Sequence, residues 1–337
     1  MKIAIFEIEP WERDAFKGLE GEHEVVFDER QLDAELAEEF KDAEILSVFI
    51  YSGLEAEVLE KFDDLKFIAS RSTGVDHIDA DYCEKHGIKV ASVPDYGSST
   101  VAEHVFALLL AISHKIVEAA DRTRRGDFSQ QGLVGFDLAG RTMGIVGTGD
   151  IGQHAAKIAK GFGMEVLAFD VKPNEEIARE IGFEYVDLHE LLSRSDVVSL
   201  HVPGSEKTKN MISTDEFAAM KHGAALINTA RGTVVDTRAM LGALADGKLR
   251  AAGLDVLPEE PVVREEAELL RSYFRETHKM DTLLADHILL RMRNVIVTPH
   301  TAFSTEEAVR RILDTTHENI EGFIKGEPKN VAIGGEE

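Results

Sequence analysis

"TMGIVGTGDIGQHAAKIAKGFGMEVLAFD", residues 142–170, is the stretch that decides the fold class of this chain. A short apolar run leads into the glycine turn Gly147-Thr148-Gly149-Asp150-Ile151-Gly152, a helical pattern follows, and a second apolar run ends at Asp170. Strand, glycine turn, helix, strand and acid in this order are typical of a βαβ unit that binds a dinucleotide. The glycine pattern alone is a weak signal, and its surroundings make it specific.

The three glycines of this turn have separate expected roles. Gly147 permits the tight turn, Gly149 lets a pyrophosphate approach the backbone, and Gly152 lets the helix pack on the strand. The helix N-terminus offers amide donors to the phosphates. Asp170 can accept hydrogen bonds from both ribose hydroxyls and repels a 2′-phosphate, so the predicted cofactor is NAD rather than NADP. A glycine turn without a ligand is the alternative interpretation.

Strand-like runs continue on both sides of this unit. In the second half of the chain they alternate with helical or loop segments and lie at residues 142–147, 165–170, 196–202, 224–230, 250–256 and 294–300. The first hundred residues alternate in the same way, with apolar runs at residues 2–8, 23–29, 44–51, 65–73 and 87–94. This alternation predicts α/β domains. We therefore expect two Rossmann-like or flavodoxin-like parallel-sheet domains.

Two helical stretches bracket the second series of strands. Thr100 and Glu103 form a capping-box pattern before a long, mostly apolar helix that Gly126 closes, and this helix is also a candidate dimer element. Ser304 and Glu307 form a second capping box before the last helix.

The positions of these helices suggest that the chain enters a second domain once and then returns to the first. We expect an NAD-binding Rossmann domain at residues 101–300, inserted into a discontinuous substrate domain of residues 1–100 and 301–337. A ligand is then expected in the cleft between the two domains.

Composition excludes several classes of function. The chain of 337 residues has 37 basic and 62 acidic side chains and a formal net charge of −25, so we expect no binding to nucleic acid or to anionic membranes. The longest apolar run, residues 105–112, is too short to cross a bilayer. The single cysteine, Cys83, excludes an intramolecular disulfide and fits the cytoplasm. We identify no metal site.

Charged and imidazole groups gather where the strands of the second series end. Arg231 follows the run "LINTA", Asp255 and Glu260 follow "AAGL", and His300 follows "VIVTP", while residues 201–203 read His-Val-Pro. In an open parallel sheet, ligands bind beyond these carboxyl ends. Arg231 can grip a carboxylate with two parallel hydrogen bonds. His300 can exchange a proton with a carbonyl oxygen, and Glu260 can orient its imidazole.

This set predicts the reduction of a 2-keto acid to a 2-hydroxy acid. Each member also has a structural interpretation: Arg231 can form an interdomain salt bridge and His300 can cap a loop. Glu260 can belong to a solvated turn, where Glu259 is its competitor for His300. The joint pattern is more specific than any member.

These motifs also carry a family resemblance. The segments "STGVDHID", "VPDYGSSTVAEH", "GIVGTGDIG", "LHVP", "INTARGTVVD", "GLDV" and "VTPHTAF" occur in the order of the D-isomer-specific 2-hydroxyacid dehydrogenases, which the chain resembles over essentially its whole length. The resemblance implies two α/β domains, NAD bound to the inserted one, homodimers, and catalytic Arg231, Glu260 and His300. It also implies that NAD contacts fall on Asp150, Ile151, Asp170, Val202, Pro203, Thr208, Thr229, Ala230 and Asp255; His201 joins this set from its position at the strand end.

Within the family, the chain is most similar to the D-lactate dehydrogenase branch. Phe303 follows the matched histidine, and the stretch between Glu260 and His300 is long. The resemblance implies a substrate pocket lined by Tyr51, Gly74, Val75, Tyr96 and Phe303. Aromatic walls would favour a small or apolar substrate side chain, although Tyr51 and Phe303 can equally be interdomain core. The segment at residues 261–292 matches no part of this pocket.

The expected function is therefore an NAD-dependent dehydrogenase that interconverts pyruvate and lactate, with the handedness of lactate implied by the resemblance alone. Alternatives of the same class use 2-hydroxyisocaproate, glyoxylate or hydroxypyruvate. An alternative of another class is an NAD-sensing binding protein of the corepressor type, which shares the fold and the triad.

Overall fold

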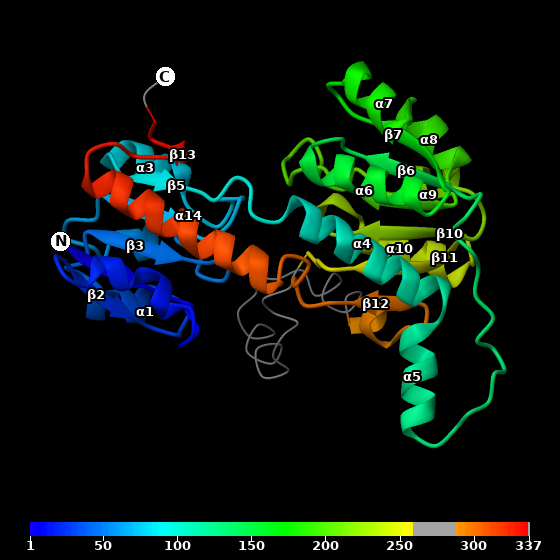
Figure 1. The fold of residues 1–337 in the computed structure, drawn as a ribbon, viewed down its shortest axis with the longest axis horizontal. Coiled ribbons are helices and arrows are strands. Elements are labelled where there is room, and N and C mark those ends of the chain that lie inside the picture. Colours follow the sequence, from blue (N-terminus) through cyan, green and yellow to red (C-terminus); the bar gives the residue numbers. More distant parts are fainter. Residues whose placement is uncertain (259–286, 336–337) are drawn as a thin grey trace. The chain divides into compact units, whose positions relative to one another are not determined.

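The chain folds into two compact units in the computed structural model, which describes residues 1–258 and 287–335. Unit 1 comprises Met1–Tyr96 and Thr305–Glu337, and unit 2 comprises Gly97–Ser304. Each unit is built on its own mostly parallel sheet with helices on both faces (Figure 1). The predicted fold class, two parallel-sheet α/β domains, is confirmed.

The described part of unit 2 holds a seven-stranded sheet whose strands run in the order β12-β11-β10-β9-β6-β7-β8 and pair in parallel. All six runs predicted in this half of the chain form strands. The strand order reverses beside β6, and ligands bind at such a switch point beyond the carboxyl ends. The strands are β6 Thr142–Val146, β7 Glu165–Phe169, β8 Glu184–Tyr185, β9 Val197–Leu200, β10 Ala224–Asn228, β11 Leu249–Leu254 and β12 Val295–Val297.

Helices cover both faces of this sheet because its strands are apolar on both sides. Met143 and Ile145 of β6 pack in one cluster with α4, α6 and α7, while Val146 packs in a second cluster with α8, α9 and α10. The helical elements are α4 Ser98–Ser113, α5 Ile116–Arg124, α6 Asp150–Gly161, α7 Glu175–Ile181, α8 Leu188–Arg194, α9 Thr214–Ala219, η3 Gly232–Val234 and α10 Thr237–Ala245.

The single helix predicted from Thr100 to Gly126 is wrong. Helix α4 begins at Ser98, after Gly97. Lys115 then takes a left-handed conformation with φ 55°, so that α5 leaves α4 at 62°. The reason is packing: α4 buries its apolar side chains, whereas α5 has no buried residue. Among the described residues no single helix is long and apolar enough to span a membrane, and only the bent pair α4–α5 meets that test jointly.

The sheet of unit 1 has the order β13-β5-β4-β3-β1-β2, and its edge strand β13 is antiparallel to β5. The strands are β1 Lys2–Ile5, β2 Glu24–Phe27, β3 Ile45–Val48, β4 Phe67–Ser70, β5 Lys89–Ala91 and β13 Val331–Ile333. The short helices η1 Arg13–Leu19, α1 Ala34–Ala37, η2 Glu38–Phe40, α2 Ala56–Leu59 and α3 Ala80–His86 connect them. The long α14, Glu306–Ile324, packs Leu313 and Ile320 against one face (Figure 1).

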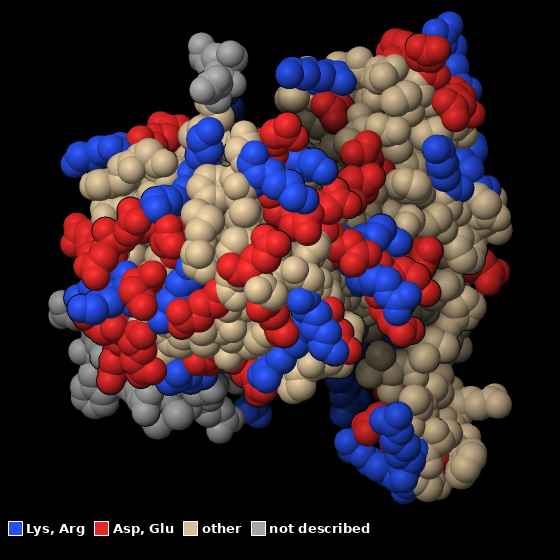
Figure 2. All heavy atoms as spheres, turned by 60° about the vertical axis from the view of Figure 1, so that its left-hand side comes forward, with Lys and Arg blue, Asp and Glu red and all other residues tan. Residues whose placement is uncertain are grey.

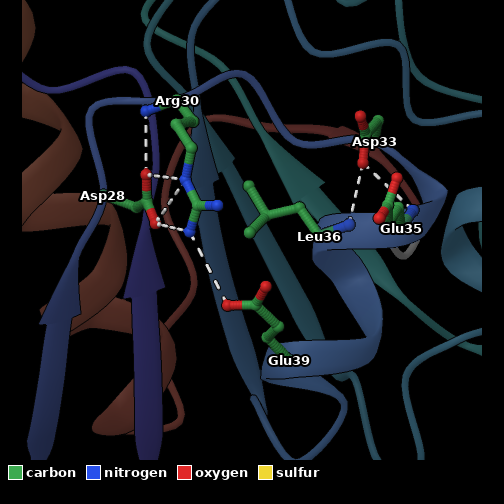
Figure 3. A network of polar contacts seen from close by, with 6 residues as sticks. All are labelled: Asp28, Arg30, Asp33, Glu35, Leu36 and Glu39. Atoms are coloured by element: carbon green, nitrogen blue, oxygen red, sulfur yellow. Dashed lines mark hydrogen bonds and ion pairs between the residues drawn. The ribbon is translucent and has the colours of Figure 1, made fainter.

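Side-chain caps set several helix ends in unit 1. Helix α14 is capped by Thr305, which accepts from Ala308 N at 3.3 Å; the predicted cap at Ser304 is therefore one residue too early. Asp33 caps α1 by accepting from the amides of Glu35 and Leu36 (Figure 3). An aspartate at an N-cap satisfies backbone donors that the helix cannot.

The acidic charge lies on the surface. Figure 2 shows acidic side chains over much of the viewed face with basic ones among them. Most ion pairs of the described residues are at least partly solvent-exposed, as in Arg194 with Glu190 and Arg125 with Asp121. Such pairs contribute little to stability, so the charge acts mainly on solubility. Within the described residues no group of three or more His, Cys, Asp or Glu is arranged to hold a metal ion.

Candidate active site

The glycine turn joins β6 to α6 and leaves room for a ligand at one point only. Gly147 has φ +96°, and a Cβ there would lie 2.7 Å from His201 O. A Cβ on Gly152 would lie 2.1 Å from Gly147 O, so the helix packs too closely for any side chain. A Cβ on Gly149 would meet nothing within 4 Å. Gly149 is also the N-cap of α6, whose first residues are Asp150 and Ile151. The geometry fits a pyrophosphate against Gly149.

Asp170 directly follows the last residue of β7, and its side chain is an ionised carboxylate. Its Oδ2 accepts from Thr148 N at 2.7 Å and from Thr148 Oγ1 at 3.0 Å, and its Oδ1 accepts from Lys172 N at 2.8 Å. Burial alone would raise the pKa of Asp170, but the hydrogen bonds from Thr148 and Lys172 outweigh it and lower that pKa. The carboxylate is thus ionised at neutral pH and lies directly beside the glycine turn.

The residues after β9 lie on the other side of the turn. His201 N donates to Val146 O at 2.7 Å, and its ring Nε2 lies 2.9 Å from Ser199 Oγ. Burial lowers the pKa of His201 to about 4, so its imidazole is neutral. Val202 and Pro203 follow, and Thr208 Oγ1 donates to Pro203 O at 2.6 Å. Thr208 therefore closes the loop that carries the preceding residues.

The turn after β10 carries Thr229, Ala230 and Arg231. Asn228, which is 1% exposed, accepts from Ala230 N and donates to Arg231 O, each at 3.0 Å, and so fixes the turn. Arg231 Nη1 donates to Ala230 O at 2.9 Å. Thr229 Oγ1 is buried and has no hydrogen-bond partner among the described residues. An orphaned hydroxyl is unusual in a folded interior, and it fits a polar ligand group.

His300 lies in a loop that Asp255 holds. Asp255 is 1% exposed; its Oδ1 accepts from Thr301 N at 2.9 Å and from Thr298 Oγ1, and its Oδ2 accepts from Ala302 N at 2.8 Å. The backbone of His300 has φ 54°, and its N lies 3.0 Å from both Asp255 O and Thr298 O. A left-handed conformation is uncommon outside glycine and persists where neighbours determine it.

A continuous chain of hydrogen bonds connects Arg231 to His300. Arg231 O accepts from Asn228 Nδ2, Asn228 O accepts from Asp255 N, and Asp255 O accepts from His300 N. Since β10, β11 and β12 are parallel neighbours, both residues lie at the edge that also carries the glycine turn and Asp170. Unit 2 thus brings together the basic group, the imidazole and the cofactor candidates, while Phe303 follows in the same loop.

Glu260, the predicted partner of His300, lies outside the described residues, as do Glu259 and most of the segment 261–292. The pocket residues predicted in unit 1 lie in loops after strands: Tyr51 after β3, Gly74 and Val75 after β4, and Tyr96 after β5. All four are partly exposed.

Sequence reasoning missed His104 of α4. Its Nε2 lies 3.0 Å from Thr298 Oγ1 and 3.5 Å from Asp255 Oδ1, so His104 contacts two residues that hold the loop of His300. A polar residue within the apolar run of residues 101–112 was the available signal.

Comparisons with known proteins agree with this geometry. The family model described as "D-isomer specific 2-hydroxyacid dehydrogenase, NAD binding domain" matches residues 106–302. The D-lactate dehydrogenase of Escherichia coli is 35% identical, covering 97% of this chain and 98% of its own. The glyoxylate reductase of Thermococcus litoralis is 38% identical, covering 88% and 85%. The structure of D-lactate dehydrogenase from Aquifex aeolicus, complexed with NAD and lactic acid, has a TM-score of 0.87 at 36% identity and covers 99% and 100%.

Proposed function

The chain belongs to the D-isomer-specific 2-hydroxyacid dehydrogenase family and is an NAD-dependent enzyme; from this premise we propose that its substrates are pyruvate and D-lactate. The observation that carries the proposal is the chain of hydrogen bonds from Arg231 through Asn228 and Asp255 to His300. These bonds fix the backbone of Arg231 relative to that of His300, which supports a carboxylate-binding group and a proton donor at the spacing that a short keto acid requires.

In the proposed reaction, Arg231 binds the carboxylate of pyruvate through charge-assisted hydrogen bonds. The hydride for the keto carbon would come from NADH held by the residues of unit 2. His300 donates a proton to the carbonyl oxygen and takes it back from the hydroxyl in the reverse direction. Glu260 orients the imidazole of His300.

Residues of unit 2 are proposed to hold NAD. The pyrophosphate is proposed to lie against Gly149, Asp150 and Ile151, while Gly147 and Gly152 shape the turn that presents them. Asp170 is proposed to bind the adenosine ribose. The remaining proposed contacts are His201, Val202, Pro203, Thr208, Thr229, Ala230 and Asp255. The orphaned Oγ1 of Thr229 and the open space at Gly149 support this assignment.

Unit 1 is proposed to be the substrate domain. Tyr51, Gly74, Val75 and Tyr96 of this unit are proposed to contact the methyl group of pyruvate. Phe303, in unit 2, is a separate proposed substrate contact. Aromatic side chains there would leave little room for a longer side chain, which is the physical basis for choosing pyruvate over 2-ketoisocaproate. The similarity to two D-lactate dehydrogenases supports the same choice.

The test is a steady-state comparison of four keto acids: pyruvate, hydroxypyruvate, glyoxylate and 2-ketoisocaproate, followed by the loss of NADH absorbance. The highest kcat/KM is expected for pyruvate, with D-lactate as the product on chiral analysis. A higher kcat/KM for glyoxylate or hydroxypyruvate would favour the reductase activity named for the Thermococcus litoralis relative. Absence of turnover with all four would favour an NAD-sensing binding protein.

A cytoplasmic homodimer is also proposed. Helix α5 has no buried residue, and four large apolar side chains on and beside it are exposed: Ile116 54%, Val117 55%, Phe128 79% and Val134 88%. Exposed apolar side chains gathered on one segment are typical of an interface. Sedimentation analysis of the wild type and of a Phe128→Ser, Val134→Ser double variant tests this, because only the variant should be monomeric.

A further inference from the structure

The partly buried carboxylate of Glu7 in unit 1 holds the loop that carries Tyr51. Glu7 Oε2 accepts from Phe49 N at 2.7 Å and from Ser52 Oγ at 2.9 Å, while Glu7 Oε1 accepts from Tyr51 N at 2.9 Å. Ser52 is fully buried and its Oγ accepts in turn from Leu32 N at 2.9 Å. Three donors from four consecutive residues thus converge on one side chain, and hydrogen bonds to a charged acceptor are the strong ones.

The backbone of Glu7 is itself held in an unusual conformation. Its φ is 53°, in the left-handed region that non-glycine residues seldom adopt. Glu7 N donates to Arg30 O at 3.2 Å, and Asp28 holds the guanidinium of Arg30 through both carboxylate oxygens (Figure 3). This conformation turns the side chain of Glu7 toward residues 49–52 instead of along the strand.

A buried arginine fixes the same residue from the other side. Arg71 is 3% exposed, and its Nη2 donates to Phe6 O at 2.6 Å and to Glu7 O at 2.7 Å, while its Nη1 donates to Ser47 Oγ at 3.1 Å. Burial raises the pKa of Glu7, and Ser52, Arg71 and the two loop amides counteract it. Glu7 is partly buried, and a carboxylate that has lost part of its water needs such partners.

We propose that Glu7 is a positioning residue that determines substrate size: it fixes the loop of residues 49–52 so that Tyr51 closes the substrate pocket. This inference rests on the proposed function, in which Tyr51 contacts the substrate. Glu7 itself contacts no substrate or cofactor and acts only through the loop. The T-shaped packing of Phe49 on Tyr51, with ring centroids 5.5 Å apart, transmits the position of the loop backbone to the Tyr51 ring.

The first experiment measures the loop directly by hydrogen exchange of the amides of Phe49 and Tyr51. Glu7→Gln leaves one acceptor oxygen for three donors and turns an NH₂ group toward the loop. Glu12→Gln is the matched control: Glu12 also lies near Arg71, but its carboxylate accepts from Glu9 N at 2.9 Å and not from the loop. Exchange at the two amides should accelerate at least about tenfold in Glu7→Gln and stay unchanged in Glu12→Gln. Equal exchange in both variants would overturn the proposed anchoring.

The second experiment measures its consequence for the substrate. In Glu7→Gln, KM for pyruvate should rise about tenfold while kcat stays within about threefold, and the preference for pyruvate over 2-ketoisocaproate should shrink. Glu12→Gln should retain the wild-type constants. A general loss of stability would lower the amount of active enzyme without changing this ratio, so the ratio separates positioning from folding.

The outcomes distinguish the inference from the proposed function. If the wild type reduces none of the keto acids, the proposed function fails, and the exchange result still decides whether Glu7 anchors the loop. If the wild type is active but the substrate ratio is unchanged in Glu7→Gln, the inference fails alone. If Glu7→Gln does not fold, Ser52→Ala is used instead, since it removes one of the three donors. Ser52→Ala should reduce the preference for pyruvate over 2-ketoisocaproate by less than is expected for Glu7→Gln. An unchanged preference would overturn the inference.

Discussion

Unit 2 and unit 1 hold their candidate site residues by different kinds of hydrogen bond. In unit 2, Asn228 is the last residue of β10 and Asp255 directly follows β11, and bonds between these neighbouring strand ends hold Arg231 and His300. In unit 1, the loop of Tyr51 depends on Glu7, which is 42 to 45 residues away along the chain. The strand ends of unit 2 are thus joined by backbone hydrogen bonds, whereas the bonds that hold the loop of Tyr51 all end on one side chain. Such a division lets substrate preference change while the cofactor edge stays intact.

The largest expected effect is on the charged group of unit 2. Arg231→Gln removes the proposed carboxylate clamp and should lower kcat/KM for pyruvate by a factor on the order of hundreds or more, with NADH binding unchanged. Arg194→Gln is the control, because Arg194 forms only surface ion pairs with Glu184 and Glu190. Normal turnover by Arg231→Gln would show that the strand ends of unit 2 do not carry the chemistry.

The second prediction concerns the buried imidazole of His201, which follows β9 in unit 2. Burial lowers the pKa of His201 from 6.5 to about 4, so the unfolded chain takes up a proton at a higher pH than the folded one does. The free energy of unfolding should therefore fall by up to about 3 kcal/mol as the pH drops from 6.5 toward 4.

His201→Gln should flatten this slope in chemical denaturation at several pH values, whereas His189→Gln, at an exposed position, should not. Identical slopes for the wild type and His201→Gln would mean that His201 is hydrated in the folded protein.

The third prediction separates folding from cofactor binding within the glycine turn. Gly152→Ala forces a Cβ to within 2.1 Å of Gly147 O and should cost roughly 1–3 kcal/mol of stability. Gly149→Ala meets nothing within 4 Å and should leave the melting temperature unchanged while weakening NADH binding. Thermal unfolding and NADH fluorescence titration of the two variants test this pair. If Gly149→Ala binds NADH as tightly as the wild type does, the pyrophosphate does not lie against Gly149.

The smallest expected effect is on the choice of cofactor. Asp170→Ala removes the carboxylate beside the glycine turn and should narrow the preference for NADH over NADPH about tenfold. Asp187→Ala, which loses only the N-cap of α8, is a control for a missing surface carboxylate. An unchanged ratio of kcat/KM for the two cofactors in Asp170→Ala would show that the ribose is recognised by other groups.

Several elements could be read from the sequence because the responsible contacts are local. Six of the seven strands in the described part of unit 2 are apolar runs bounded by breakers. The order of glycines between residues 147 and 152 decides which positions can approach another backbone. Asp170 lies at the end of a run, so its place at the strand end needed no tertiary information.

Most of the features that the sequence did not predict depend on contacts that are not local. The break at Lys115 arises because α4 packs against the sheet and α5 does not, and the pairing of β13 with β5 joins residues that lie some 240 positions apart. The N-cap of α14 is Thr305 rather than Ser304 because Thr305 has the extended backbone and accepts from Ala308 N.

The amino-acid sequence alone thus determined the fold class, the glycine turn and the residue types at the strand ends, because each depends on neighbours within a few positions. Only the tertiary structure decided that Asp255 and His104 support the loop of His300, and that Glu7 and Arg71 lie beneath the loop of Tyr51. Hydrogen bonds between residues far apart in the chain form when the sheets assemble, and no periodicity of the sequence records them.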